Sequence, residues 1–121
     1  MKATELRIGN YVMCEPTIDD WEEKVITLHS LLQVDISPES YCGIPLTEEW
    51  LLKFGFDETI VEGYPLYQSN KGFIVEYYVD ESVFLILDFE VRVKHVHQLQ
   101  NLYFALTGEE LEIKERQNAQ R

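Results

Sequence analysis

Two histidines, His95 and His97, stand two positions apart and have the clearest potential for metal chemistry, since imidazole is a common metal ligand. On an extended strand both rings would point to one side, where Asp88, Glu90 or His29 would complete the coordination. If a helix begins near His95, the two imidazoles instead diverge by about 200° around its axis, which no single ion can bridge. The residues that follow indicate a helix, so we expect neither a metal site nor a cofactor.

The two cysteines, Cys14 and Cys42, are the candidate nucleophiles. A reactive thiolate needs a helix N-terminus or a basic neighbour that lowers its pKa, and the sequence shows neither beside these residues. Their number and spacing match no disulfide framework and no CxxC metal motif, so reduced structural thiols are expected. Carboxylate pairs arise by chance in so acidic a chain, and glycine-rich phosphate loops are absent from the sequence. We therefore predict no enzymatic activity, with a small enzyme of unrecognised site as an alternative.

An acidic segment surrounds a large aromatic residue at Asp19-Asp20-Trp21-Glu22-Glu23. An aromatic anchor ringed by charge commonly seats a protein partner. In a second interpretation, Trp21 covers the open end of a small barrel while the carboxylates stay solvated. In a third, the acidic groups imitate nucleic-acid phosphates and inhibit a DNA-binding protein. Trp21 is therefore a candidate interaction residue.

The segment from Val96 to Leu106 carries the strongest helical periodicity in the chain. Its apolar stripe consists of Val96, Leu99, Leu102, Tyr103 and Leu106. Phe104 lies roughly 140° from the centre of this stripe, beside His97, Gln100 and Asn101. Either the helix is sandwiched within the fold, or this second side packs against another chain, for which a homodimer is the simplest assembly. These four residues complete the predicted interaction surface.

Hydrophobic alternation predicts strands in the first third of the chain. Leu6 to Met13 alternates as a first strand that bends at Gly9-Asn10, because a glycine at a slip in the alternation typically marks a bulge. After an acidic loop from residue 15 to residue 23, Lys24 to Leu28 and Leu32 to Ile36 alternate as two further strands. Three curved strands of this kind would form part of a small barrel.

Two helices are expected to pack on the strands. The first is short, with Thr47 as its N-cap, glutamates in its first turn and Gly55 at its end. The second runs from about His95 to Leu106 and ends at Thr107-Gly108.

The second half of the chain contains four more strand patterns, at residues 63–67, 73–79, 83–87 and 89–93. The first of these is predicted as an edge strand, because Pro65 cannot donate to a central ladder. The third is apolar on both faces, as in a central strand. Asp88 to Glu90 fits both a turn and a strand, and Leu111 to Ile113 fits a short last strand.

These elements predict an α+β fold class, with a small antiparallel sheet or an SH3-like partial barrel, one short helix and one longer C-terminal helix. A length of 121 residues suits one domain, which we place at residues 1–114. Residues 115–121 have nothing apolar to bury against a core and are expected to form a mobile polar tail.

The formal net charge of −12 limits the possible partners. Nucleic acid and anionic membranes are polyanions, so the chain is expected to bind neither. The N-terminal residues lack the apolar core of a signal peptide, and the longest apolar run, Val83 to Leu87, is too short to span a bilayer. We therefore expect a cytoplasmic protein whose partner is another protein or a second copy of itself.

Two stretches, residues 44–56 (IPLTEEWLLKFGF) and residues 96–111 (VHQLQNLYFALTGEEL), together with Leu6 to Val12, resemble a group of small uncharacterised proteins of Bacteroides-type gut bacteria and their phages. The resemblance covers most of the chain. It implies a cytoplasmic, phage- or prophage-associated protein, and it implies no activity because none is assigned to the group.

A second resemblance concerns local architecture. Arg7 to Val12, followed by Lys24 to Leu28, looks like the first two strands of SH3-like barrels, although Glu23-Lys24 stands where such barrels commonly place a glycine. With no reactive centre in view, the expected function is a non-catalytic protein-interaction module. An acidic nucleic-acid mimic that inhibits a DNA-binding protein is the alternative.

Overall fold

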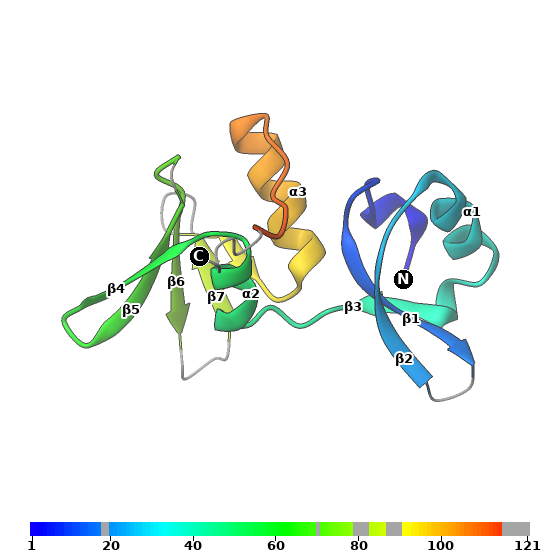
Figure 1. Cartoon of the computed structure of the whole chain (residues 1–121), viewed down its shortest axis with the longest axis horizontal. Helices are drawn as coiled ribbons and strands as arrows, with labels where there is room; N and C mark the ends of the chain where they lie inside the picture. The colour runs from blue at the N-terminus through cyan, green and yellow to red at the C-terminus, as the bar shows by residue number, and fades with distance from the viewer. Residues whose placement is uncertain (18–19, 70, 79–82, 87–90, 115–121) are drawn as a thin grey trace. The chain divides into compact units, whose positions relative to one another are not determined.

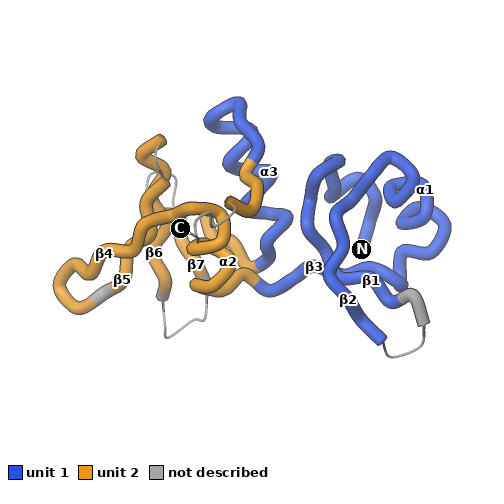
Figure 2. Tube along the Cα trace, in the orientation of Figure 1, with its two compact units in different colours: residues 1–45, 95–110 blue, residues 46–94, 111–121 orange. Residues whose placement is uncertain are grey.

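The computed structural model describes residues 1–17, 20–69, 71–78, 83–86 and 91–114. They form a mixed α/β structure with two antiparallel sheets and a C-terminal helix, so the predicted α+β class is confirmed (Figure 1). The chain divides into two compact units (Figure 2). Unit 1 comprises residues 1–45 and 95–110, and unit 2 comprises residues 46–94 and 111–121. The boundary of a single domain at residue 114 stays a prediction, and the predicted tail lies outside the described residues.

Unit 1 contains a three-stranded sheet in the order β2-β1-β3. The strands are β1 (Tyr11–Thr17), β2 (Asp20–Val25) and β3 (Tyr41–Gly43). Cys14 lies opposite Tyr41 in the ladder of β1 and β3, whereas Cys42 lies opposite Met13. The two thiols therefore project from opposite faces of the sheet, and both cysteines are free.

The third predicted strand of this region is wrong, because its residues belong to helix α1 (Leu28–Ile36). The Thr27 hydroxyl caps this helix by accepting a hydrogen bond from the Ser30 N–H at 3.1 Å. The helix ends at Ile36, with Ser37 as its C-cap, before Pro38, which cannot continue it. The third strand of the sheet is instead β3, so the barrel predicted from consecutive strands is not formed by those segments.

Other boundaries in unit 1 also differ from the prediction. Residues 3–5 form a 3-10 helix, η1 (Ala3–Glu5), and the first strand begins only at Tyr11. The predicted acidic loop is largely strand, since β1 extends to Thr17 and β2 begins at Asp20. A further 3-10 turn, η2 (Pro38–Ser40), leads from α1 into β3.

One hydrophobic cluster of unit 1 joins η1, the sheet and α1. It consists of Leu6, Val12, Ile26 and Val34, with Met1, Ala3, Leu31 and Tyr41 packed against it. Burial of a side chain of this size contributes about 1.5–3 kcal/mol.

Helix α3 (Val96–Thr107) matches the predicted C-terminal helix. His95 is its N-cap, and Gly108 ends it in the left-handed conformation with φ 78°. The helix is attached to the strand end by a hydrogen bond of 2.9 Å from the Val96 N–H to the Ile44 carbonyl. Of the predicted stripe, Val96, Leu99 and Tyr103 are buried, whereas Leu106 is exposed.

Unit 2 is an antiparallel meander of five strands in sequence order. The strands are β4 (Asp57–Val61), β5 (Tyr64–Gln68), β6 (Ile74–Tyr78), β7 (Val83–Ile86) and β8 (Val91–Val93). The short predicted helix is α2 (Glu48–Lys53), capped by Thr47, whose hydroxyl accepts from the Trp50 N–H at 3.3 Å. β7 lies between β6 and β8, as predicted for a central strand.

Two predictions for unit 2 are wrong. β5 is not an edge strand, because β4 pairs with it, and Pro65 lies opposite Ile60. The proline is tolerated because β6 pairs only with Leu66 to Gln68, so the missing N–H lies beyond that ladder. Residues 111–113 form no strand, although Leu111 is buried. Asp88 to Glu90 lies outside the described residues.

Candidate interaction surface

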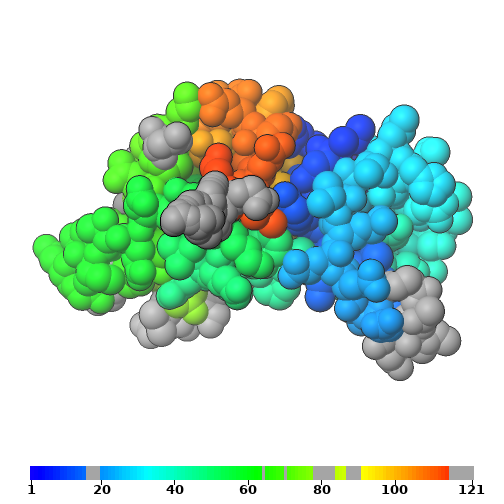
Figure 3. All heavy atoms as spheres, in the orientation of Figure 1, coloured from blue at the N-terminus to red at the C-terminus, as the bar shows by residue number. Residues whose placement is uncertain are grey.

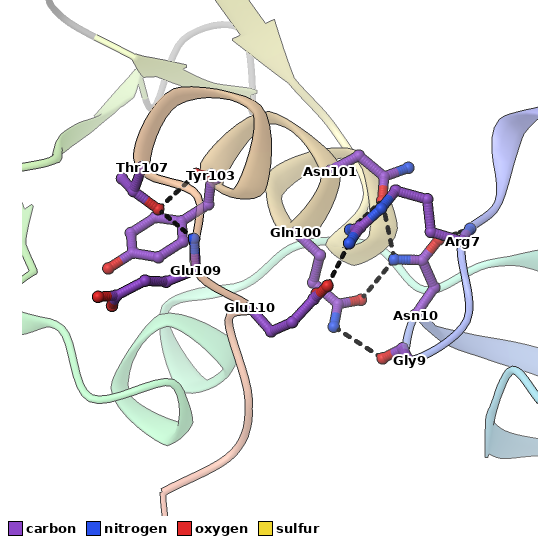
Figure 4. Close-up of polar contacts among 9 residues, drawn as sticks. All are labelled: Arg7, Gly9, Asn10, Gln100, Asn101, Tyr103, Thr107, Glu109 and Glu110. Carbon is purple, nitrogen blue, oxygen red and sulfur yellow. Dashed lines mark hydrogen bonds and ion pairs between the residues drawn. The ribbon is translucent and has the colours of Figure 1, made fainter.

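The polar face of α3 contacts the N-terminal segment of its own unit (Figure 4). The Gln100 side chain donates to the Gly9 carbonyl at 3.0 Å and accepts from the Tyr11 N–H at 2.8 Å. The Asn101 side chain donates to the Glu5 carbonyl at 3.0 Å. These two amides therefore satisfy backbone groups of a loop about 90 residues away in the sequence, and Gln100 is only 1% exposed.

Phe104, the aromatic residue outside the apolar stripe, is covered by a cation. The Arg7 guanidinium lies over its ring, 4.0 Å from the centroid. The same guanidinium donates to Asn101 at 3.3 Å and forms an ion pair with Glu110. Cation–π contacts contribute about 0.5–2 kcal/mol, so Arg7 stabilises the ring on one face, although Phe104 as a whole is 38% exposed.

The two histidines lie close together. His95 is an N-cap with extended backbone, so its ring stacks on that of His97, with centroids 5.8 Å apart and an interplanar angle of 22°. The predicted divergence of the rings is wrong, because it assumed that His95 is helical. A Cβ at Gly43 would lie 2.8 Å from the His95 ring, so only glycine fits beside the pair. Within the described ranges, no group of three or more His, Cys, Asp and Glu residues could hold a metal ion.

His97 is a buried base with an incomplete hydrogen-bond set. Burial lowers its pKa, the neighbouring His95 lowers it further, and Glu5 raises it in part. Its Nε2 lies 3.9 Å from a carboxylate oxygen of Glu5, and its Nδ1 is buried with no hydrogen-bond partner among the described residues. The imidazole is therefore neutral at neutral pH and is held in unit 1 by packing.

Cys14, the partly buried cysteine, has a raised pKa, whereas an activated nucleophile has a lowered one. Burial raises the pKa of the Cys14 thiol, and Glu22 raises it as well, while Lys24 lowers it in part. A thiol with a raised pKa is protonated at neutral pH, and only the thiolate attacks. The geometry gives no support to cysteine catalysis at this position.

Trp21 lies on β2, at one edge of the sheet of unit 1. All six residues of this strand are exposed, and the Trp21 side chain is 38% exposed. Charged residues on an edge strand discourage pairing with other strands, and Glu22, Glu23 and Lys24 follow Trp21 directly. Trp21 therefore stands on a charged edge, apart from the four α3 residues predicted with it.

Unit 1 also has an exposed apolar helix face that the sequence analysis did not predict. We define the outer ridge as Leu28, Leu32 and Ile36 of α1, which are 68%, 59% and 72% exposed. Their spacing of four residues places them on one side of the helix, whereas the buried Ser30 and Val34 lie on the other. The segment from residue 28 to residue 36, blue to cyan, contributes to the surface seen in Figure 3.

The signal for this ridge was present in the sequence. Thr27 three residues before Ser30, the i, i+4, i+8 leucine and isoleucine spacing, and Pro38 after the last turn are typical of a short helix. The prediction of a strand at Leu32 to Ile36 concealed them, since strand residues alternate between two faces.

Comparison with known proteins identifies no relative. No protein-family model matches this chain, and no curated protein or solved structure is significantly similar to it. In the part of the chain that the structure describes, no helix has both the length and the apolar character needed to cross a bilayer.

Proposed function

We propose that the protein is a non-catalytic protein-interaction module and that the outer ridge of α1 is its binding surface. The observation that carries the proposal is the exposure of Leu28, Leu32 and Ile36 on one face of a single helix. Exposed single leucines are ordinary, but contiguous apolar side chains on one face mark interaction sites.

The composition of α1 supports this function. A helix with apolar residues on both sides is normally covered on both sides. Here Val34 is fully buried in the core of unit 1 and Leu31 is packed against that core, while the outer ridge points away from them. The ridge side chains are more than half exposed and do not belong to the cluster around Val34, and a partner would account for their apolar character.

The four α3 residues have a different role in this proposal. His97 and Gln100 are buried, and Asn101 and Phe104 contact Arg7. We assign them to the internal attachment of α3 and not to partner binding. Trp21 remains an accessible aromatic side chain on β2, and it is a second position from which a partner can be probed.

Site-specific photo-crosslinking tests the proposal. A photoreactive residue replaces Leu32 in the full chain, made in the organism that encodes it, and a matched chain carries it at Leu52, a helical leucine of unit 2 that is 51% exposed. We expect an adduct of one discrete mass from position 32 and none from position 52. An adduct of twice the chain mass identifies a homodimer, which is also an interaction. No adduct from position 32, or the same adducts from both positions, contradicts the proposal.

A further inference from the structure

We infer that strand β4 pairs in antiparallel fashion with β4 of a second copy of this chain, which joins two five-stranded sheets edge to edge. The inference goes beyond the proposed function, because it concerns unit 2 and does not depend on the outer ridge. It follows from the open edge of β4, from the backbone groups at that edge and from the side chains that a two-fold axis brings together.

β4 is an edge strand without the usual protection. It ends the strand order of its sheet, and among the described residues no strand pairs with its other side. All five residues are exposed, Ile60 by 60% and Val61 by 44%. Lysine, proline and bulges commonly protect such edges, but β4 has no lysine or proline and its register with β5 has no shift. The edge strand β2, by contrast, carries Lys24 and has a register shift.

The turn between β4 and β5, in green in Figure 1, shows which backbone groups face the open side. Glu62 and Gly63 have φ angles of 51° and 84°, as the two central residues of a type I′ hairpin turn do. The residues that flank such a turn exchange backbone hydrogen bonds, so every second residue of β4, counted back from Val61, bonds to β5. The N–H and C=O groups of Glu58 and Ile60 therefore point to the open side.

A two-fold axis at Thr59, the middle residue of β4, provides partners for these groups. In an antiparallel pair centred there, Glu58 of one copy lies opposite Ile60 of the other, and the two residues exchange both backbone hydrogen bonds. Thr59 meets its own counterpart at a non-hydrogen-bonded position, where side chains approach most closely and threonine pairs are favourable. The open N–H and C=O groups of both strands are then all bonded.

The same register keeps like charges from lying opposite each other. Asp57 lies opposite Val61, and Glu58 lies opposite Ile60, so each carboxylate faces an apolar side chain. An axis at Glu58 would oppose two glutamates, and an axis at Ile60 would oppose Glu58 and Glu62. The side chains therefore favour the axis at the middle of the strand.

The acidic residues of β4 do not prevent this pairing. The Glu58 carboxylate accepts a hydrogen bond from the buried Tyr67 hydroxyl at 3.4 Å, so it has a partner within unit 2. The Lys114 side chain lies against Gly55, two residues before Asp57, and adds positive charge at this end of the strand. The net charge of −12 on each copy opposes association, and salt screens charges separated by more than about 8 Å at physiological ionic strength. Self-association should therefore strengthen as the salt concentration rises.

Disulfide crosslinking of the full chain tests the register. Serine first replaces both native cysteines (Cys14→Ser and Cys42→Ser). Thr59→Cys then places two thiols across the axis, with Cα atoms about 4.5 Å apart, which a disulfide spans. We expect a linked dimer of twice the chain mass in a glutathione redox buffer. Asp57→Cys, exposed on the same face of β4, is the matched control and should crosslink at least ~10-fold less, because its two copies lie about 13 Å apart along the strands.

A mixture of two variants tests the same register from both ends of the strand. Asp57→Cys and Val61→Cys chains should crosslink to each other, because these positions lie opposite, while each variant alone should crosslink little. If Asp57→Cys links to itself as readily as Thr59→Cys does, the crosslinks arise from random collision and the inference is overturned.

Sedimentation velocity measures the association without a crosslink. The contact of two short strands is smaller than the ~1,200 Å² of a stable interface, so we expect dissociation constants on the order of 0.1 mM. Ile60→Lys, which places lysine opposite Glu58, should bind its own copy at least ~10-fold more tightly than Ile60→Glu. The same exchange at Leu52, exposed on α2, changes the net charge equally and should alter the association less than ~3-fold.

Four outcomes overturn the inference. The first is a chain that stays monomeric at ~1 mM. The second is an equal effect of the charge exchange at positions 60 and 52. The third is a dimer that weakens as the salt concentration rises, since ion pairs would then hold it. The fourth is a dimer that Leu32→Gln abolishes, which would place the contact on the outer ridge and support the proposed function instead.

Discussion

Helices α1 and α3 both carry hydrophobic or aromatic side chains on more than one side, but the second side of α3 is partly covered within unit 1. Around α3, the amides of Gln100 and Asn101 bind backbone of residues 5–11, and Arg7 covers Phe104. Around α1, the outer ridge is left more than half exposed. An apolar residue outside the main stripe therefore does not by itself indicate a partner. The indication comes from whether other side chains of the same chain pack on it.

The largest effect on this comparison is expected from Gln100. Gln100→Ala leaves the Tyr11 N–H and the Gly9 carbonyl without their side-chain partner in a part-buried site, so we expect a loss of about 2–4 kcal/mol in the free energy of unfolding. Urea titration followed by circular dichroism measures it. Gln33→Ala on α1 is the matched control and should change the stability by less than about 0.5 kcal/mol. Equal effects of the two substitutions would remove the contrast between the helices.

Gly43→Ala tests the close packing at the start of α3. The added Cβ would lie 2.8 Å from the His95 ring and 3.0 Å from the His97 ring, so we expect a loss of about 1–3 kcal/mol. In a His95→Ala background the cost should fall, because one of the two rings is gone. A cost that is the same in both backgrounds would show that the stacked pair is not what excludes a side chain here.

The buried His97 predicts a pH dependence. Its pKa is lower in the folded chain than in the unfolded chain, so the unfolded state binds more protons once the pH falls below the unfolded value of about 6.5. The free energy of unfolding should therefore be highest above the unfolded pKa. It should decrease as the pH falls towards the folded pKa, by at most about 1.4 kcal/mol per pH unit.

Urea titrations at pH 7.5 and pH 5.5 measure this dependence, with both values chosen as roughly one unit on either side of the unfolded pKa. His97→Gln should reduce it, whereas His29→Gln, at an exposed position of α1, should retain it. If the pH dependence of the free energy of unfolding is the same in His97→Gln, other titratable groups cause it.

The cover of Phe104 by Arg7 should be measurable as a coupling. A double-mutant cycle with Arg7→Met and Phe104→Leu should give a coupling free energy of about 0.5–1 kcal/mol, which falls only slightly in high salt because the ring is not an ion. Arg7→Met also removes the ion pair with Glu110, and the cycle cancels that part. A coupling near zero would mean that the ring gains nothing from the cation.

The smallest effect on stability is expected from the outer ridge itself. Leu32→Gln and Ile36→Gln should each change the free energy of unfolding by less than about 0.5 kcal/mol, because these side chains are exposed in both states. Val34→Ala, two positions away and fully buried, should cost about 1–3 kcal/mol. A large loss from Leu32→Gln would show that the ridge is covered by the chain itself.

Much of the secondary structure was predictable because its causes are local. The Thr47 cap defined the start of α2, and Gly108 with a repeating apolar stripe defined α3. Helix α1 was missed for an equally local reason. Leu32-Gln33-Val34-Asp35-Ile36 alternates with a period of two, as a strand does, and this pattern concealed the helix signals of the Thr27 cap, the four-residue apolar spacing and Pro38.

The candidate site was predictable only in part. The sequence singled out Phe104 and the polar residues around it as a second face, since helical geometry follows from spacing. It could not show that Arg7 and Gly9 cover this face, because a contact across about 90 residues is set by packing. For the same reason, the exposure of Leu28, Leu32 and Ile36 appeared only once the side of α1 that meets the core was known.

The amino-acid sequence by itself determined the acidic charge, the α+β class, the free thiols and the helices and strands whose caps and periodicity are unambiguous. The tertiary structure alone decided which apolar faces are covered. The physical reason is that charge and local propensity are properties of single residues and near neighbours, whereas burial depends on which distant segments the chain brings together.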